Sequence, residues 1–427
     1  MNKTYYPKSE TWSDLLKRPT QTIADVEATV NQIFSELKLK GDEAVKKYTQ
    51  LFDGISIDEL AVSKEEIESA EKEVSSELKA AINLAKANIE KFHSAQKTET
   101  ITVETIEGVN CWQEKRPIQK VGLYIPGGSA PLFSTVLMLA VPATIAGCKE
   151  IVLCTPPDKS GNINPAILFT ARLCGVSQIF KIGGIQAIGA MTFGTESVPA
   201  VYKIFGPGNQ FVTVAKQIAT KYGVAIDMPA GPSELLVFAD DTAHASFVSS
   251  DLLSQAEHGA DSQVILVTTS EKFLNSVEKE VEKQLQKLPR KAIAKKAMEN
   301  SKLILIENNS EAINLINEYA PEHFIVVSKE EDFFVENIQN AGSVFIGNNT
   351  PESAGDYASG TNHTLPTNGF AKQYSGVNLD SFMKSMTFQK ISEKGIQNIG
   401  KAIETMAEAE GLQAHKNAVT LRLNNLK

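Results

Sequence analysis

The sequence predicts an α/β protein in which two open-sheet units follow one another, with small helical pieces at the N-terminal and C-terminal ends. From about residue 120 onward, short apolar runs alternate with helical segments. The first four runs start 29, 28 and 24 residues apart, a spacing that suits βαβ units with parallel strands. The residues before them instead carry apolar side chains three and four positions apart among many Lys and Glu, which indicates helices.

The predicted elements run along the chain as follows. Helices are expected at 23–37, 41–52 and 63–96. The first open-sheet unit, from about residue 122 to residue 232, has predicted strands at 121–125, 150–155, 178–182 and 202–205, and helices at 132–146, 164–174, 185–193 and 209–222. The second unit has predicted strands at 235–239, 263–267, 303–306, 324–327 and 343–346, and helices at 244–257, 271–288 and 310–319. A polar loop at 360–378 precedes a predicted helix at 395–411, so we expect a final arm from near Leu379.

The composition limits the class of protein. The 427 residues include 42 Lys and Arg against 51 Asp and Glu, a net charge of −9, which argues against nucleic acid as the main partner. The first residues lack the apolar stretch of an export signal, and the most apolar segment, 136–148, is interrupted by Pro142, so we expect a soluble cytoplasmic protein. The cysteines form no CxxC pair and are expected to be reduced and buried: Cys111, Cys148, Cys154 and Cys174.

Two glycine-rich turns join predicted strands to predicted helices in the first unit. They are YIPGGS at 124–129 and FGPGN at 205–209. Backbone N–H groups in such turns can approach a phosphate at the start of a helix. Neither turn contains the GxGxxG or GxxxxGK[ST] fingerprint, so both remain equally explicable as tight turns that need only the conformational freedom of glycine.

Gln255 and His258 lie three residues apart at the end of a predicted helix that Gly259 would cap. This spacing puts both side chains on one face, where they could bind the same metal ion. The alternative is a polar helix end whose His interacts with the helix dipole.

Glu322 and His323 follow a proline and lead directly into a predicted buried strand. An imidazole beside a carboxylate can supply two proton acceptors for successive steps near neutral pH. Because the pair enters a strand instead of following one, its position alone does not place it in the usual ligand crevice of an α/β sheet. The alternative is an exposed turn pair.

Other candidate residues occupy polar segments near the C-terminal end. Asp356 lies among small residues, where a carboxylate could approach a metal or a substrate, although a turn-forming Asp is an equal alternative. Glu410 and His415 could serve a site or a solvated helix end, and His363 lies in the long polar loop. The two remaining histidines are expected to be structural: His93 and His244.

Seven segments of the sequence, in this order, resemble those of histidinol dehydrogenases. The matching segments are GLYIPGGSAPL at 122–132, IFGPGN at 204–209, DMPAGPSE at 227–234, SQAEHG at 254–259, APEH at 320–323, SAGD at 353–356 and EGLQAHKN at 410–417. The resemblance implies zinc-dependent and NAD-dependent oxidation of L-histidinol through L-histidinal to L-histidine, the last two steps of histidine biosynthesis. It also implies one zinc ion per subunit and an intertwined homodimer.

The same resemblance implies an anatomy with two incomplete Rossmann-like domains. An N-terminal arm would span residues 1–20, and residues 122–235 would bind NAD. Residues 21–121 together with 236–378 would form the α/β domain that carries the metal and the catalytic residues. Residues 379–427 would form a C-terminal helical piece that contributes to the site of the partner subunit.

The family motifs imply the following roles by position. Glu322 and His323 would be the catalytic proton acceptors. The zinc ligands would be Gln255, His258, Asp356 and, from the partner subunit, His415. The substrate would contact Ser233, Gln255, His258, His323, Asp356, Glu410 and His415, with His363 as a further candidate. NAD would contact Tyr124, Gln186 and Asn209.

Two other classes are compatible with the residues without the resemblance. The same His, Asp and Glu side chains could serve a zinc hydrolase, in which a metal-bound water is the nucleophile. Two α/β units could also enclose the ligand of a binding protein without catalysis. Formation of NADH from L-histidinol and NAD⁺ would separate the dehydrogenase from both.

Overall fold

The computed structural model describes residues 1–19, 24–127, 130–229 and 231–426. The chain forms two compact units, one comprising Met1–Ala95 and Gln119–Phe382 and the other comprising Gln96–Ile118 and Met383–Lys427. Among the described residues, no helix combines the length and the apolarity needed to cross a bilayer.

The first unit contains an open parallel sheet of the predicted Rossmann-like kind. Its order is β6-β5-β4-β7-β8, from strands β4 (Lys120–Tyr124), β5 (Glu150–Thr155), β6 (Gln178–Lys181), β7 (Lys203–Phe205) and β8 (Ala225–Ile226). The connecting helices are α6 (Phe133–Ala146), α7 (Pro165–Leu173), α8 (Gly184–Phe193) and α9 (Gln210–Ala219), and a 3₁₀ turn, η2 (Thr220–Tyr222), follows α9. The order reverses between β4 and β7, and in such sheets ligands bind outside the carboxyl ends of the strands at this reversal.

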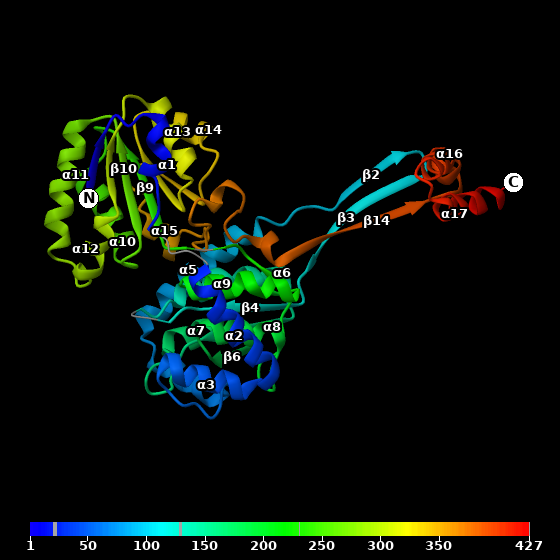
Figure 1. Ribbon diagram of the computed structural model, residues 1–427, viewed down its shortest axis with the longest axis horizontal. Coiled ribbons are helices and arrows are strands. Elements are labelled where there is room, and N and C mark those ends of the chain that lie inside the picture. Colours follow the sequence, from blue (N-terminus) through cyan, green and yellow to red (C-terminus); the bar gives the residue numbers. More distant parts are fainter. Residues whose placement is uncertain (20–23, 128–129, 230, 427) are drawn as a thin grey trace. The chain divides into compact units, whose positions relative to one another are not determined.

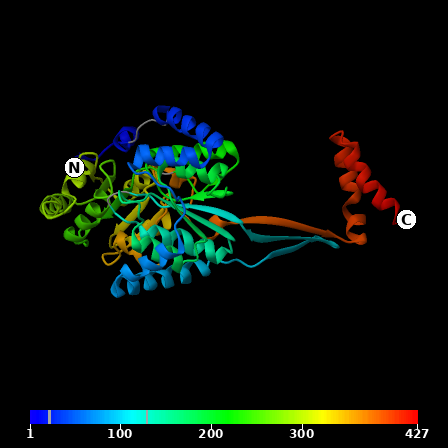
Figure 2. The ribbon, with the colours of Figure 1, turned by 90° about the horizontal axis from the view of Figure 1, so that it is seen from below.

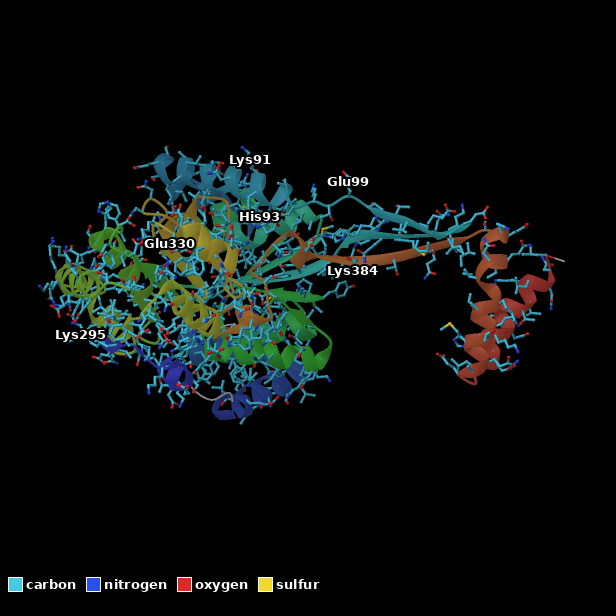
Figure 3. The ribbon with its side chains drawn as sticks, turned by 90° about the horizontal axis from the view of Figure 1, so that it is seen from above. Lys91, His93, Glu99, Lys295, Glu330 and Lys384 are labelled. Atoms are coloured by element: carbon cyan, nitrogen blue, oxygen red, sulfur yellow. The ribbon has the colours of Figure 1, made fainter. Side chains whose placement is uncertain are left out.

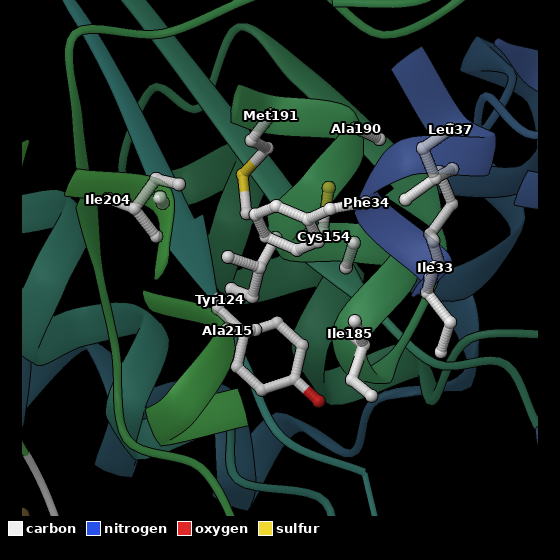
Figure 4. Packing of buried hydrophobic residues seen from close by; sticks show 14 of the residues in the cluster. Ile33, Phe34, Leu37, Tyr124, Cys154, Ile185, Ala190, Met191, Ile204 and Ala215 are labelled. Carbon is white, nitrogen blue, oxygen red and sulfur yellow. The ribbon is translucent and has the colours of Figure 1, made fainter. Parts of the chain in front are cut away.

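N-terminal helices complete the two faces of this sheet. Helices α2 (Ala24–Lys40) and α3 (Asp42–Asp53) pack against α8, and α2 also packs against α9. Phe34 of α2 lies in the same apolar cluster as Tyr124 and Met191 (Figure 4). Helices α4 (Lys64–Glu73) and α5 (Ser76–Ser94) pack against α7 and α6. The sequence predicts one long helix at 63–96, but the chain breaks at extended Val74, and Ser75 caps a new helix by accepting a hydrogen bond from Leu78 N–H.

The first unit also contains a second parallel sheet, with order β1-β11-β10-β9-β12-β13. Its strands are β1 (Asn2–Tyr5), β9 (Glu234–Ala239), β10 (Gln263–Thr268), β11 (Lys302–Leu305), β12 (His323–Val327) and β13 (Ser343–Ile346). Helices α10 (Ala245–Ala256), α11 (Glu271–Leu285) and α12 (Lys291–Glu299) cover one face (Figure 1). The other face is covered by α1 (Trp12–Leu15), α13 (Asn309–Tyr319) and α14 (Glu331–Asn337).

Short elements complete the first unit. They are η1 (Ser9–Thr11), α15 (Glu352–Tyr357), η3 (Phe370–Lys372) and η4 (Leu379–Phe382). Together the two parallel sheets confirm the predicted α/β fold class. Residues 21–121 are expected to group with residues 236–378, whereas α2 and α3 share their apolar core with the sheet that contains β4.

The second unit is an antiparallel sheet followed by two helices, and its strands were not predicted. The sheet has the order β14-β3-β2, from β2 (Ile101–Ile106), β3 (Val109–Pro117) and β14 (Met383–Ile391). Trp112 and Phe388 stack across β3 and β14 with ring centroids 5.2 Å apart. Helices α16 (Glu393–Ala409) and α17 (Gln413–Asn424) pack against each other (Figure 2).

Candidate active site

The backbone of Glu234, at the amino end of β9, contacts both candidate proton acceptors, one through its N–H group and the other through its C=O group. The N–H of Glu234 donates to Oε2 of Glu322 over 2.8 Å, and the carbonyl oxygen of Glu234 lies 3.1 Å from Nδ1 of His323. The parallel pairing of β9 with β12 brings these residues together, because Glu322 and His323 enter β12 beside the start of β9. Glu322 is 6% exposed and His323 is 3% exposed, so the alternative of an exposed turn pair is wrong.

Three carboxylates surround the His323 ring. Oε2 of Glu322 lies 3.6 Å from Nδ1, and Oδ1 of Asp356 lies 3.8 Å from Nε2. Burial alone would lower the pKa of His323, but the carboxylates of Glu322, Glu352 and Asp356 outweigh burial and raise that pKa to about 10. Among the described residues, Nε2 of His323 is buried without a hydrogen-bond partner. The ring therefore presents one unsatisfied nitrogen to the carboxylate side of the site.

Glu352, at the start of α15, is a site residue that the sequence analysis missed. Burial, reinforced by repulsion from Asp356 and Glu322 and opposed by His323, raises the pKa of Glu352 to about 8. Nε2 of Gln255 donates to Oε1 of Glu352 and lies 3.2 Å from Nδ1 of His323. Glu352 and Asp356 are four residues apart, so they share one face of α15, and this spacing was a signal available in the sequence.

These residues fit a bound cation. His323, Glu352 and Asp356 each offer a ligand atom, and these atoms lie within 4.8 Å of one another. Gln255 adds an amide oxygen, Oε1, which is buried without a partner among the described residues. An imidazole, an amide oxygen and two carboxylates form a donor set that a divalent ion can use, and the ion would also offset the crowded negative charge.

The structure brings together only part of the predicted ligand set. Gln255 and Asp356 both lie beside His323. His258 is exposed in the turn that follows α10, beyond the last helical residue, Ala256. His415 is exposed on α17 and Glu410 is exposed at the end of α16, both in the second unit. These three side chains are thus exposed, whereas Gln255 and His323 are buried.

His363 links this group to the sheet that contains β4. Its Nδ1 lies 2.9 Å from the carbonyl oxygen of Asp356, and its Nε2 lies 3.2 Å from the hydroxyl of Thr135 in α6. Burial lowers the pKa of His363, although Asp356 opposes this effect. Ser233, directly before Glu234, is half-buried at the entrance to β9. His363 thus lies between the Asp356 segment and the helix that follows β4.

A separate cavity of about 1080 Å³ lies at the carboxyl ends of β4, β5 and β6 and at the start of α9. Tyr124, Gln186 and Asn209 all line this cavity. The Tyr124 hydroxyl accepts a hydrogen bond from Gly184 N–H over 3.1 Å, and Nε2 of Gln186 donates to Asp53 over 3.3 Å. Asn209 caps α9 by accepting from Val212 N–H. A cavity this large suits a ligand bigger than a typical drug-sized molecule, for which pockets of roughly 300–1,000 Å³ are usual.

The two glycine-rich turns border the same cavity. A Cβ at Gly206, where φ is +126°, would lie 2.1 Å from the carbonyl oxygen of Tyr124, so close backbone packing requires glycine there. A Cβ at Gly127 would lie 2.1 Å from a ring carbon of Pro156. Gly128 and Ser129 of the first turn lie outside the described residues. The glycines therefore shape tight turns, and these turns form the rim of a cavity.

Of the remaining histidines, His93 is buried and His244 is exposed; of the cysteines expected to be buried, Cys154 and Cys174 are buried whereas Cys111 and Cys148 are half-buried. His93 is buried on α5, and its Nδ1 lies 2.9 Å from the carbonyl oxygen of Ile89 (Figure 3). His244 precedes α10, with its ring 4.9 Å from that of Phe247. All four cysteines are free thiols, two of them fully buried, and burial raises the pKa of both Cys148 and Cys174 to about 12.

The first unit thus defines an α/β enzyme with a nucleotide-sized cavity on one sheet and a buried acid–base site suited to a cation on the other. Comparison with known proteins identifies the particular family. The sequence model of the histidinol dehydrogenase family matches residues 16–423, and the chain belongs to this family. Dehydrogenases are oxidoreductases, so this chain is a member of an oxidoreductase family.

Individual members of this family are similar to this chain over nearly its whole length. The chain is 62% identical to histidinol dehydrogenase from Bacteroides thetaiotaomicron, with 99% of each chain covered. It is 53% identical to histidinol dehydrogenase from Escherichia coli, with 98% of this chain and 96% of the relative covered. The crystal structure of histidinol dehydrogenase from Elizabethkingia anophelis superposes with a TM-score of 0.97 at 58% identity, covering 100% of this chain and 98% of that chain.

Proposed function

We propose that this protein oxidises L-histidinol through L-histidinal to L-histidine, with NAD⁺ as the hydride acceptor in both steps, at the end of histidine biosynthesis. One observation carries the proposal: buried Glu322 and His323 contact the backbone N–H and C=O groups of a single residue, Glu234, and His323 adjoins Gln255 and Asp356. Membership of the family supports the choice of substrate.

His323 is the proposed base for both hydride transfers. Its Nδ1 faces the Glu234 carbonyl oxygen at 3.1 Å, an interaction that favours a proton on Nδ1. The surrounding carboxylates alone would also keep Nε2 protonated, so the bound cation, by offsetting their charge, would lower the pKa of His323 and free the Nε2 lone pair. Nε2, which has no hydrogen-bond partner among the described residues, can accept the proton of the substrate alcohol as hydride leaves the adjoining carbon. The proton acceptor and the reacting carbon must be held in near-attack geometry for this step.

Glu322 is the proposed base for the hydration of the aldehyde. Its carboxylate is held by the Glu234 N–H and remains within 3.6 Å of the His323 ring. After NADH exchanges for NAD⁺, Glu322 would take a proton from water as the water oxygen adds to the carbonyl carbon of L-histidinal. His323 would then accept the hydroxyl proton of the hydrate during the second hydride transfer.

Zinc is the proposed metal, with Gln255, His258, Asp356 and His415 of the partner subunit as ligands. The buried, unpartnered Oε1 of Gln255 and the position of Asp356 beside it support this assignment. When bound, zinc would take the imidazole and amino nitrogens of the substrate as neutral donors and so orient it. Substrate contacts are proposed for Ser233, Gln255, His258, His323, His363, Asp356, Glu410 and His415.

NAD is proposed to bind residues 122–235, in the cavity that Tyr124, Gln186 and Asn209 line. The reversal of strand order between β4 and β7 supports this placement, because such reversals form nucleotide crevices. Residues 236–378 would bind the metal ion and provide the two bases. The Thr135 contact with His363 supports a nicotinamide position between the two sheets, since it joins α6 to the segment after Asp356.

A homodimer is proposed, in which the second unit serves the site of another copy. Glu410 and His415 are exposed on this unit. Large apolar side chains are exposed there as well and would be covered by association: Ile101, Val103, Ile106, Met386, Ile391, Met406, Leu412 and Leu421.

A stoichiometric assay tests the proposed function. The zinc-loaded protein is mixed with limiting L-histidinol and excess NAD⁺, and NADH absorbance is measured together with the L-histidine formed. We expect two NADH for each L-histidine. Absence of NADH from a folded, zinc-loaded protein would refute the dehydrogenase and return attention to hydrolysis or ligand binding.

A further inference from the structure

Arg18 connects the chain segments that lead into the two strands of the candidate active site. Its guanidinium binds both carboxylate oxygens of Glu234, through Nε to Oε1 and through a terminal nitrogen to Oε2 at 2.9 Å. The same terminal nitrogen donates to the carbonyl oxygen of Tyr319 over 2.7 Å. Glu234 is the first residue of β9, and Tyr319 precedes Glu322 by three residues. One side chain therefore binds the approaches to β9 and to β12.

The groups around Arg18 hold it in place. The guanidinium carbon lies 4.0 Å from the centre of the Tyr319 ring, and the Tyr319 hydroxyl donates to Oε1 of Gln263 over 2.9 Å. Nε2 of Gln263 donates to the carbonyl oxygen of Lys17 over 3.0 Å, which fixes the backbone next to Arg18. The Glu234 carboxylate also accepts a hydrogen bond from Asn368 N–H. This planar set of contacts is specific to a guanidinium, because an ammonium group has no fork of fixed donors.

The positions of Glu322 and His323 depend on where the backbone of Glu234 lies. Its N–H binds Glu322 and its carbonyl oxygen contacts His323. The segment between Tyr319 and Glu322 has little freedom, since Ala320 has a φ of +52° and Gly342 packs where a Cβ would lie 2.5 Å from the Glu322 carbonyl oxygen. A shift of the Glu234 side chain would therefore be transmitted to both proposed bases.

We propose that Arg18 is a positioning residue for Glu322 and His323 and that it acts through the carboxylate and the backbone of Glu234. This inference rests on the proposed function, because it concerns the same two bases. It predicts that loss of the guanidinium impairs the chemical steps and leaves nucleotide binding intact, since Arg18 is not among the residues that line the cavity.

The test compares Arg18→Met and Arg18→Lys with the wild type and with a matched control, Arg172→Met. Arg172 pairs with Glu71 at 2.9 Å on an exposed surface, so its loss is expected to leave activity unchanged. For each zinc-loaded variant we would measure kcat with L-histidinol, kcat with L-histidinal, KM for NAD⁺ and the melting temperature. A displacement of about 1 Å can cost roughly 100-fold in rate, so we expect kcat to fall about 10- to 100-fold for both substrates in Arg18→Met.

The accompanying readouts separate positioning from a general loss of structure. KM for NAD⁺ should stay within about twofold of the wild type, and Arg18→Lys should recover part of kcat because it keeps the charge but not the fork. Wild-type kcat in a folded Arg18→Met or Arg18→Lys variant would overturn the inference. The inference would also be overturned if kcat and nucleotide affinity fell together, in proportion to the fall in melting temperature. Failure of the wild type to form NADH would instead refute the proposed function.

Discussion

The buried ion pair between Lys216 and Asp227 makes a measurable prediction about the nucleotide cavity. The two side chains are 2% and 1% exposed, and they enclose Gly206. Nζ of Lys216 donates to the Gly206 carbonyl oxygen over 2.7 Å, while Gly206 N–H donates to Oδ2 of Asp227 over 2.8 Å. Because Gly206 also packs against Tyr124 and lies three residues before Asn209, the pair sets the shape of the cavity rim.

Replacing Lys216 by Met leaves a buried carboxylate without its counter-ion. Breaking a buried pair in this way typically costs about 3–5 kcal/mol of unfolding free energy. With roughly 2–4 °C of melting temperature per kcal/mol for domains of about 150–250 residues, we expect a fall of roughly 6–20 °C. Removing both charges, in Lys216→Met with Asp227→Asn, should cost less than the single change because no isolated charge is left.

Differential scanning calorimetry and steady-state kinetics would measure these effects. We expect Lys216→Met to raise KM for NAD⁺ more than KM for L-histidinol, since the displaced turn leads to Asn209, which lines the nucleotide cavity. Lys283→Met is the matched control, because its pair with Glu280 on α11 is exposed and should contribute less than about 1 kcal/mol. An unchanged melting temperature in Lys216→Met, or a double variant less stable than the single one, would refute the reasoning.

Two further predictions concern histidines. His258→Asn should lower zinc content, measured by atomic absorption, with the fold retained, whereas His244→Asn at the other end of α10 should leave it unchanged; equal zinc in both variants would contradict the ligand assignment. His93 is buried and its pKa is lowered, so unfolding takes up a proton and stability decreases as pH falls below the ordinary value of about 6.5. His93→Gln should flatten the pH dependence of the unfolding free energy, measured by urea titration, between about pH 7 and 5. The same dependence of unfolding free energy on pH in the variant and the wild type would contradict this account.

The parallel sheets could be predicted from sequence because their strands are buried on both faces. Within β9 and β10 the stretches 235–239 and 264–267 are wholly apolar, and this pattern stands out between helices. The antiparallel strands of the second unit escaped prediction because β2 is exposed along its whole length and β14 along most of it. Strand β1 is a polar edge strand whose partner, β11, lies about 300 residues away.

The site was predictable only as far as local motifs reach. Glu322 and His323 are adjacent in sequence, so their motif could be found, and the four-residue spacing of Glu352 and Asp356 could have been noticed too. The contact of Glu234 with Glu322 joins residues 88 apart, and that of Arg18 with Glu234 joins residues 216 apart. Such contacts depend on the order of strands in the sheet, which no single motif encodes.

The division of labour between the two bases can be tested most directly with Glu322→Gln. Glutamine can still accept the hydrogen bond from Glu234 N–H, but it cannot take a proton from water. In stopped-flow absorbance measurements with enzyme in excess over L-histidinol, the first NADH per substrate should form at a rate within about tenfold of the wild-type rate. The second NADH should form about 100- to 10,000-fold more slowly than in the wild type. Glu318→Gln, exposed on α13, should release both at wild-type rates, whereas an equal slowing of the first and second NADH in Glu322→Gln would contradict the account.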